Sequence, residues 1–220
     1  MGIFDFFKGV KKAKKNVPDW EKDGYEKNYH LNGQLESEGK WVNGKREGLW
    51  KNYSENGQLG YEGKYVNGKS EGPWKYYHDN GQLESEGKYV NGKKEGLWKS
   101  YHENGQLSGE VTWSGRSEMN MNGISKYYHD NGQLKSKGRV KDSKKEGVWK
   151  YYFDNGKLTS EGTYKNGIPV GISKFYFRSG QLESEGKWVN GKKEGLWKFY
   201  HENGKLFCET NFKDGIEIRS

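Results

Sequence analysis

The sequence predicts an all-β protein, an elongated antiparallel β-meander built from eight hairpin repeats of about 24 residues, with a short N-terminal helix in front. The first observation behind this is the recurrence of a turn glycine at steps of 24 residues, with a single step of 27. A fixed period in this range is typical of repeat arrays, in which each unit is one supersecondary element. The eight turn glycines are Gly33, Gly57, Gly81, Gly105, Gly132, Gly156, Gly180 and Gly204.

The second observation is the order of elements inside one unit, for which residues 71–94 serve as the example. A Trp/Tyr-rich run is followed by Asn80-Gly81, a second alternating run and Asn91-Gly92. Asn-Gly between alternating runs is a strong hairpin signal, because a type I′ turn needs positive φ at both central residues. Two strands in each of eight repeats give about sixteen strands without intervening helices.

The third observation is the placement of the aromatic residues, which make up 15% of the chain. Only 30% of the residues are hydrophobic and the mean hydropathy is -1.22, values that by themselves favour disorder. However, eight of the nine tryptophans occupy fixed positions of the repeat, Trp20 being the exception. We therefore expect an ordered chain that is stabilised by aromatic rather than aliphatic burial.

The N-terminal part, residues 1–23, is expected to hold an amphipathic, basic helix over residues 3–15 and a linker. Its apolar side chains include Phe4, Phe6 and Phe7, and lysines such as Lys11 and Lys12 follow. One interpretation is a cap that covers the open edge of the first repeat. The alternative is a helix that lies on an anionic membrane surface through these five residues, with the repeats as a spacer.

The strand register of the 71–94 unit follows from placing Asn80 and Gly81 at the centre of a two-residue turn. Alternation then puts Trp74, Tyr76, Leu83 and Tyr89 on one face and Lys75, Tyr77, Glu84, Glu86, Lys88 and Val90 on the other. An indole opposite a glycine can lie across the bare backbone, so Trp74 is expected to cover Gly87. The predicted cross-strand pairs are Trp74 with Gly87, Lys75 with Glu86, Tyr76 with Ser85, and His78 with Leu83.

Counted from the turn glycine, position −9 is glycine, −6 lysine, −4 tyrosine and +2 leucine in all eight copies. The register places the lysine at −6 opposite the residue at +5, which is glutamate in seven copies and Lys137, facing Lys126, in the other. Each exposed pair contributes little, but together they favour one register and a soluble face. The seven pairs are Lys27/Glu38, Lys51/Glu62, Lys75/Glu86, Lys99/Glu110, Lys150/Glu161, Lys174/Glu185 and Lys198/Glu209.

These motifs, Glu-Gly-Leu-Trp-Lys-x-Tyr-x-x-Asn-Gly-Gln-Leu and Glu-Gly-Lys-Trp/Tyr-Val-Asn-Gly-Lys, closely resemble the MORN-repeat variant (membrane occupation and recognition nexus). The likeness is greatest to bacterial antitoxin or immunity proteins of the YwqK type, and it covers about residues 24–217 of the 24–220 repeat region. The resemblance implies a twisted single-layer β-meander. It also implies a non-catalytic role in protein–protein contact, toxin neutralisation or phospholipid contact.

Residues that could carry chemistry are better explained by the repeat. All five histidines (His30, His78, His102, His129 and His201) occupy position −3. Equivalent positions lie two strands, or about 9–10 Å, apart, too far for shared zinc ligation. Glutamates at +3 and +5 lie on a solvated face beside lysines, and no phosphate loop or nucleophile motif appears. We therefore expect no enzyme, no cofactor and no metal.

The places that break the repeat are the better candidates for a binding site. Residues 108–122 replace the regular second half of the fourth repeat, carry the three extra residues and contain Trp113, Arg116, Met119 and Met121. Tryptophan, methionine and arginine are enriched at interfaces. This favours a partner-binding loop, although a tolerated insertion at a loop tip is equally compatible. Trp74 and Trp98 on the aromatic face are further candidate anchors.

The resulting hypothesis is a non-catalytic protein-binding repeat protein, an antitoxin or immunity protein that neutralises a partner toxin by occlusion. Peripheral membrane binding and a purely structural scaffold are the alternatives. Half of the net charge of +8 belongs to residues 1–17, so the repeats are not expected to bind nucleic acid. A single cysteine, no long apolar run and no secretory signal indicate the cytoplasm.

Overall fold

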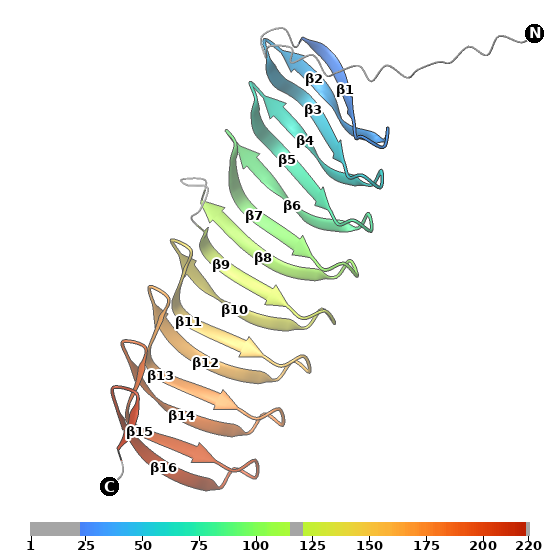
Figure 1. The fold of residues 1–220 in the computed structure, drawn as a ribbon. Coiled ribbons are helices and arrows are strands. Elements are labelled where there is room, and N and C mark those ends of the chain that lie inside the picture. Colours follow the sequence, from blue (N-terminus) through green and yellow to red (C-terminus); the bar gives the residue numbers. More distant parts are fainter. Residues whose placement is uncertain (1–22, 115–120, 219–220) are drawn as a thin grey trace, which may run out of the picture.

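The computed structural model describes residues 23–114 and 121–218, which form one sheet of seventeen antiparallel strands (Figure 1). Each strand pairs with the next one along the chain. The strands are β1 (Gly24–Tyr29), β2 (Leu35–Val42), β3 (Lys45–Tyr53), β4 (Leu59–Val66), β5 (Lys69–Tyr77), β6 (Leu83–Val90), β7 (Lys93–Tyr101), β8 (Leu107–Ser114), β9 (Met121–Tyr128), β10 (Leu134–Lys141), β11 (Lys144–Tyr152), β12 (Leu158–Lys165), β13 (Ile168–Tyr176), β14 (Leu182–Val189), β15 (Lys192–Tyr200), β16 (Leu206–Lys213) and β17 (Ile216–Ile218).

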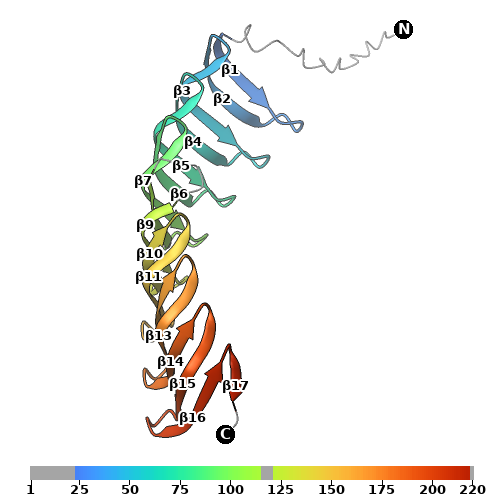
Figure 2. The same cartoon turned by 90° about the vertical axis from the view of Figure 1, so that its left-hand side faces the viewer.

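The predicted fold class is confirmed, with the short strand β17 in addition to the sixteen expected strands. The sheet is a single layer that bows and twists along its length (Figure 2). Turns between the two strands of a repeat line one long edge, and turns between repeats line the other (Figure 1). Because the described residues form no second layer on the sheet, each strand packs on its sequence neighbours. The predicted N-terminal helix lies outside the described residues.

The turns between repeats are two-residue type I′ turns, as predicted. Asn91 has a φ of 52° and Gly92 a φ of 81°, and the flanking residues Val90 and Lys93 face each other. Asparagine tolerates this left-handed conformation better than most residues, and glycine adopts it without steric cost. The same conformation occurs at Asn43, Asn67, Asn166, Asn190 and Asp214.

The turns within repeats are different, and the type I′ prediction for Asn80-Gly81 was wrong. Only Gly81 has positive φ, 82°, and its N–H donates to the His78 carbonyl oxygen at 2.8 Å. The loop therefore has three residues, and Leu83 faces Tyr77 instead of His78. The side chain of Asn80 favours this geometry because its Oδ1 accepts the Gln82 N–H at 2.9 Å, an interaction made in a local turn.

The rest of the predicted register is confirmed, since Trp74 faces Gly87, Lys75 faces Glu86 and Tyr76 faces Ser85. Toward the preceding repeat the pairing contains a bulge, because Trp74 faces Gly63 while Glu71 faces Lys64. The two extra residues are Gly72 and Pro73. Gly72 has a φ of 74°, which accounts for the glycine at position −9 of every repeat.

The core of this single layer is a row of buried tryptophans, namely Trp50, Trp74, Trp98, Trp149 and Trp197. The indole of Trp74 lies over Gly63 of the preceding repeat, not over Gly87 as predicted, and Gly87 lies under Trp98. The Trp74 Nε1–H also donates to the Lys64 carbonyl oxygen at 3.2 Å, where the bulge shifts the register. Each indole therefore joins one repeat to the repeat before it.

This arrangement explains two of the three positions that lack tryptophan; the third, Ser173, lies over Gly162 and has no structural explanation. Glu26 lies on the first described strand, which has no preceding repeat to cover. Between the fourth and fifth repeats the glycine is replaced by Val111, and the facing residue is the buried Ser125. A valine side chain fills the space in which the indole would lie, so the two exceptions occur together.

The segment 108–122 is more regular than predicted. Residues up to Ser114 belong to β8, which pairs with β7 from Ser114 opposite Glu95 to Leu107 opposite Tyr101. On the other side, Trp113 faces Met121 of β9. Because both strands keep the repeat register up to these points, the three extra residues must lie within 115–120, outside the described residues.

Candidate partner-binding site

The aromatic face of the sheet, which carries the tryptophan row, is covered in part by cationic side chains from position −11. They lie over the indole of the same strand, at distances typical of cation–π contacts. The distances from the cationic group to the ring centre are 4.5 Å for Arg46 over Trp50, 4.1 Å for Lys94 over Trp98, 5.0 Å for Lys145 over Trp149 and 4.3 Å for Lys193 over Trp197. Burial lowers the pKa of the Lys94 ammonium group.

The third repeat has Ser70 at this position, and a hollow of about 400 Å³ lies beside it. A serine is too short to extend over the aromatic rings as Arg46 does. The hollow is open on the aromatic face and combines two aromatic rings with one ammonium group, a lining typical of interface hot spots. Its lining residues are Ser70, Tyr89, Gly92, Lys94 and Trp113.

The structure places Trp113 and Met121 of the predicted site together, facing each other on β8 and β9. Both are half-buried, and Trp113 lines the hollow. The backbone of Met121 is held by Ser143, whose Oγ accepts the Met121 N–H at 3.1 Å and whose N–H donates to the Met121 carbonyl oxygen at 3.1 Å. Arg116 and Met119 lie outside the described residues.

Trp74 and Trp98, the other two candidate anchors, are 3% and 4% exposed. An indole buried to this degree in the core offers little area to a partner. Their expected place on the aromatic face is confirmed, as Trp74 stacks near Tyr76 and meets Tyr89 edge-on. The reason for their burial is the bare glycine of the preceding repeat, which lets the ring lie flat against the backbone.

The candidate membrane-contact residues Phe4, Phe6, Phe7, Lys11 and Lys12 lie outside the described residues. Within residues 23–114 and 121–218, no helix has the length and apolar character needed to cross a bilayer.

The opposite face, here called the Lys/Glu face, carries a network that the sequence did not reveal. The tyrosine at position −4 donates its hydroxyl to the glutamate at position +5 of the preceding repeat, at 2.9–3.2 Å. The presence of this tyrosine in all eight copies was the sequence signal from which the network could have been predicted. The pairs are Tyr53/Glu38, Tyr77/Glu62, Tyr101/Glu86, Tyr128/Glu110, Tyr176/Glu161 and Tyr200/Glu185.

Lysines complete this network, and they also account for its exception. Lys27 lies 3.2 Å from Glu38, whose pKa is lowered by the Tyr53 hydroxyl and, to a smaller extent, by Lys27 and Tyr25. Lys126 faces Lys137 as predicted, but its ammonium group lies 3.0 Å from Glu110 on its other side. The like-charged pair is therefore compensated by the preceding repeat.

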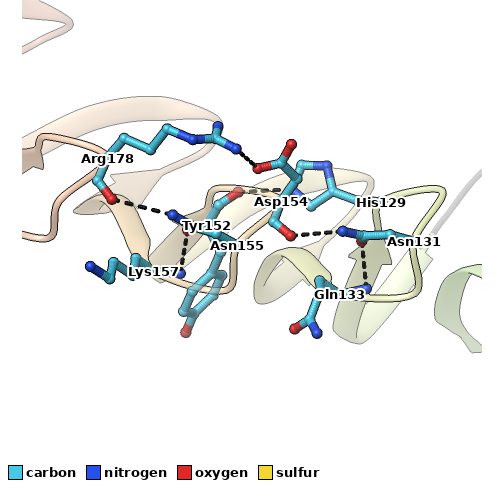
Figure 3. Close-up of polar contacts among 8 residues, drawn as sticks. All are labelled: His129, Asn131, Gln133, Tyr152, Asp154, Asn155, Lys157 and Arg178. Atoms are coloured by element: carbon cyan, nitrogen blue, oxygen red, sulfur yellow. Dashed lines mark hydrogen bonds and ion pairs between the residues drawn. The ribbon is translucent and has the colours of Figure 1, made fainter.

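The edge formed by the turns within repeats is a ladder of side-chain hydrogen bonds from one repeat to the next (Figure 3). The Nε2–H of His129 donates to the Tyr152 carbonyl oxygen at 2.9 Å, and Nδ2 of Asn131 donates to the Asp154 carbonyl oxygen at 2.7 Å. His30, His78 and His102 make the equivalent bond. These four histidines thus have a structural role. Among the described residues, no three potential metal ligands lie close enough to share an ion.

Replacing Asn131 by alanine is expected to destabilise the protein by about 1–2 kcal/mol, because it removes two hydrogen bonds. One joins Asn131 to the next repeat, and the other is accepted by its Oδ1 from the Gln133 N–H at 3.0 Å. Asn203→Ala is the control, since Asn203 accepts the Lys205 N–H in the last of the described repeats, whereas Asn131 is bonded to a following repeat. Chemical denaturation should show a clearly smaller loss for Asn203→Ala. Equal losses would mean that the bond between repeats contributes nothing.

The fold and the repeat-to-repeat contacts define the class, an all-β repeat protein whose hairpin units stack in one dimension. The model of the MORN repeat variant family matches eight segments, so the chain belongs to the MORN repeat variant family, whose repeats have binding roles. The matched residues are 22–43, 46–67, 70–91, 94–114, 121–142, 145–166, 169–190 and 193–214.

Two further comparisons add little. No curated protein matches the chain. A solved structure of a mutant of S. aureus TarM, in complex with fondaparinux, alpha-GlcNAc-glycerol and UDP, is similar over 45% of this chain, with 15% identity and a TM-score of 0.30. The match spans 19% of the TarM chain.

Proposed function

We propose that this chain is a non-catalytic, cytoplasmic antitoxin or immunity protein that binds a partner toxin and neutralises it by occlusion. The observation that carries the proposal is the hollow beside Trp113. Ser70 replaces the covering cation there, as Met121 and Pro169 do in the fifth and seventh repeats, and nearby the chain inserts three residues between β8 and β9. The combination of the open hollow and the insertion gives the repeat scaffold a distinct surface there.

The physical argument is that folding does not require this irregularity. The second and fourth repeats pack with Trp, Gly and a covering cation. A half-exposed aromatic hollow beside Lys94 instead suits recognition, since a partner side chain can displace water from Tyr89 and Trp113 and contact the ammonium group. Occlusion by an elongated sheet needs no catalytic group, in agreement with the proposed absence of enzymatic activity.

The test is neutralisation of the toxin that a neighbouring gene encodes, measured as growth of cells that express both proteins. The variant Trp113→Ala/Met121→Ala is expected to weaken binding of the purified toxin at least 10-fold and to abolish growth rescue, as hot-spot truncation typically costs about 2 kcal/mol or more. Trp188→Ala is the matched control. It removes an indole at the same position of a repeat without an insertion, where Trp188 meets Trp197 edge-on.

Loss of rescue by Trp188→Ala as well would point to general destabilisation, which thermal unfolding of all variants would reveal. Full rescue by a stably folded Trp113→Ala/Met121→Ala protein would reject the hollow as the binding site. If no neighbouring gene product is toxic and none binds, the antitoxin function is wrong.

A further inference from the structure

A row of exposed apolar residues runs along the Lys/Glu face, one from each repeat at position −8. These side chains are about half exposed, from 45% for Leu196 to 65% for Tyr25. Position −8 follows the bulge glycine, so the residue lies in the bulge and faces only one neighbouring strand, as Leu49 faces Lys64. The row consists of Tyr25, Leu49, Pro73, Leu97, Ile124, Val148, Ile172 and Leu196.

Folding does not explain why this position is apolar in every copy. A side chain that stays half exposed gains little from burial, and a polar residue would serve as well in a bulge. Strand propensity favours isoleucine, valine and tyrosine, but it does not favour proline at position 73 or leucine at positions 49, 97 and 196. A regular row of exposed apolar side chains is instead typical of an interaction surface.

The charges beside the row define the partner. Between Pro73 and Leu97 lies a depression of about 290 Å³ with Gly87 and Trp74 in its lining. Its other lining residues are three lysines (Lys75, Lys88 and Lys99) and one glutamate, Glu86. One oxygen of Glu86 already accepts the Tyr101 hydroxyl at 2.9 Å. Lys88 faces Glu95 on β7, and among the described residues no carboxylate lies close enough to Lys88 to form an ion pair. The lining of the depression thus holds more lysines than glutamates.

The spacing of the row matches an extended chain. Successive members are two strands apart, which is about 9.6 Å, and three residues of a polyproline II segment, which make one turn of that helix, span about 9.3 Å. A segment that crosses the strands would therefore place every third side chain on the row. Acidic residues between them would meet the lysines at position +7.

The first three intervals of the row are complete. Each has glycine followed by lysine on the intervening strand, as Gly39-Lys40, Gly63-Lys64 and Gly87-Lys88. The next interval has Val111-Thr112, so it lacks both the glycine, which leaves space between the row residues, and the lysine charge. The continuous surface thus extends from Tyr25 on β1 to Leu97 on β7.

We propose that this surface binds an extended acidic segment of a protein partner, with an apolar residue at every third position. The inference rests on the proposed protein-binding function and names a second contact for it, on the face opposite the Trp113 hollow. Apolar side chains of the segment lie beside Leu49, Pro73 and Leu97, and its carboxylates pair with Lys64 and Lys88.

The test uses a fluorescein-labelled peptide of four Leu-Glu-Asp triplets and the full chain, with fluorescence anisotropy as the readout. A peptide of the same composition with its leucines clustered tests the spacing. We expect the regular peptide to bind at least tenfold more tightly than the clustered one. Leu49→Ser/Leu97→Ser and Lys64→Glu/Lys88→Glu should each weaken binding at least tenfold, and higher salt should weaken it as well.

Val148→Ser is the matched control. It also removes an apolar residue at position −8, but Val148 faces Thr163 instead of a lysine. It should leave the affinity unchanged within twofold. Because all these side chains are exposed, unchanged thermal unfolding verifies that each variant is folded. Equal binding of the two peptides, or full binding by Leu49→Ser/Leu97→Ser, overturns the proposal.

Two further measurements separate this proposal from its rivals. One is binding to vesicles of phosphatidylserine and phosphatidylcholine. If the vesicles bind wild type but not Leu49→Ser/Leu97→Ser, and the peptide does not bind, the row is a membrane-binding surface and the proposal is rejected. Trp113→Ala/Met121→Ala should keep full peptide binding. If the peptide binds but the protein neutralises no toxin, the antitoxin function alone is rejected. If the protein neutralises the toxin, Leu49→Ser/Leu97→Ser does not affect neutralisation and no peptide binds, this inference alone is rejected.

Discussion

Replacing Gly63 by alanine is expected to destabilise the protein by about 3 kcal/mol, because the new methyl group has no space. A Cβ built on Gly63 would lie 2.2 Å from the Trp74 ring, and the indole would have to leave the core. Chemical denaturation followed by circular dichroism measures the loss. Gly60→Ala on the same strand is the control, since its Cβ would approach no atom closer than 3.5 Å and should cost little.

A rescue experiment distinguishes this clash from a general intolerance of the strand. Gly63→Val combined with Trp74→Ser reproduces the natural pair of Val111 and Ser125 between β8 and β9. We expect the two substitutions together to cost less than the sum of their separate costs, since the serine leaves space for the valine. Strict additivity would contradict the explanation given for the missing tryptophan in the fifth repeat.

Alkaline pH is expected to unfold the protein as the tyrosines of the Lys/Glu face ionise. Burial, and then the hydrogen bond to a glutamate, raises the pKa of Tyr53, Tyr77 and Tyr101 from 10.0 to about 12. A phenol whose pKa is raised by folding stabilises the folded state fully below about pH 10, its unfolded pKa. That contribution is lost between about pH 10 and pH 12, as the phenol ionises beside a carboxylate.

The check is the midpoint of unfolding as a function of pH for wild type and for Tyr53→Phe/Tyr77→Phe/Tyr101→Phe. The triple variant should be less stable at pH 8, where it lacks three hydrogen bonds, but should lose stability less steeply above pH 10. Tyr152→Phe is the control. At position +5 of the preceding repeat, Tyr152 meets Lys137 instead of a glutamate, and an ammonium group cannot accept its hydroxyl hydrogen. An equally steep loss in the triple variant would assign the alkaline transition to the lysines instead.

Much of the fold could be predicted because each repeat is specified by local signals. Asn91-Gly92 predicted its type I′ turn, and alternation predicted the partners of Trp74, Lys75 and Tyr76. The type I′ prediction for Asn80-Gly81 was wrong, because an Asn-Gly pair is also compatible with a three-residue loop when the asparagine side chain bonds to the backbone. Sequence alone does not decide between the two loops.

The candidate site could be predicted only in part. The insertion and the half-exposed Trp113 were found from composition and period, but Trp74 and Trp98 turned out to be buried. Whether an indole in a single-layer sheet is exposed depends on the strand it leans toward. That choice is made by the bulge at Gly72 and by the bare Gly63, which belongs to the neighbouring repeat. The hollow beside Ser70 likewise depends on a missing side chain.

The sequence by itself determined the number of repeats, the two-strand unit, most of the register and the division into an aromatic and a Lys/Glu face, because these follow from period and alternation. Only the tertiary structure decided how repeats join. Trp74 covers the preceding repeat, Tyr77 donates to Glu62 of the preceding repeat, and Asn80 donates to the Glu103 carbonyl oxygen of the following one. The physical reason is that a repeated sequence offers each side chain two equivalent neighbours, and only packing and hydrogen-bond geometry select one.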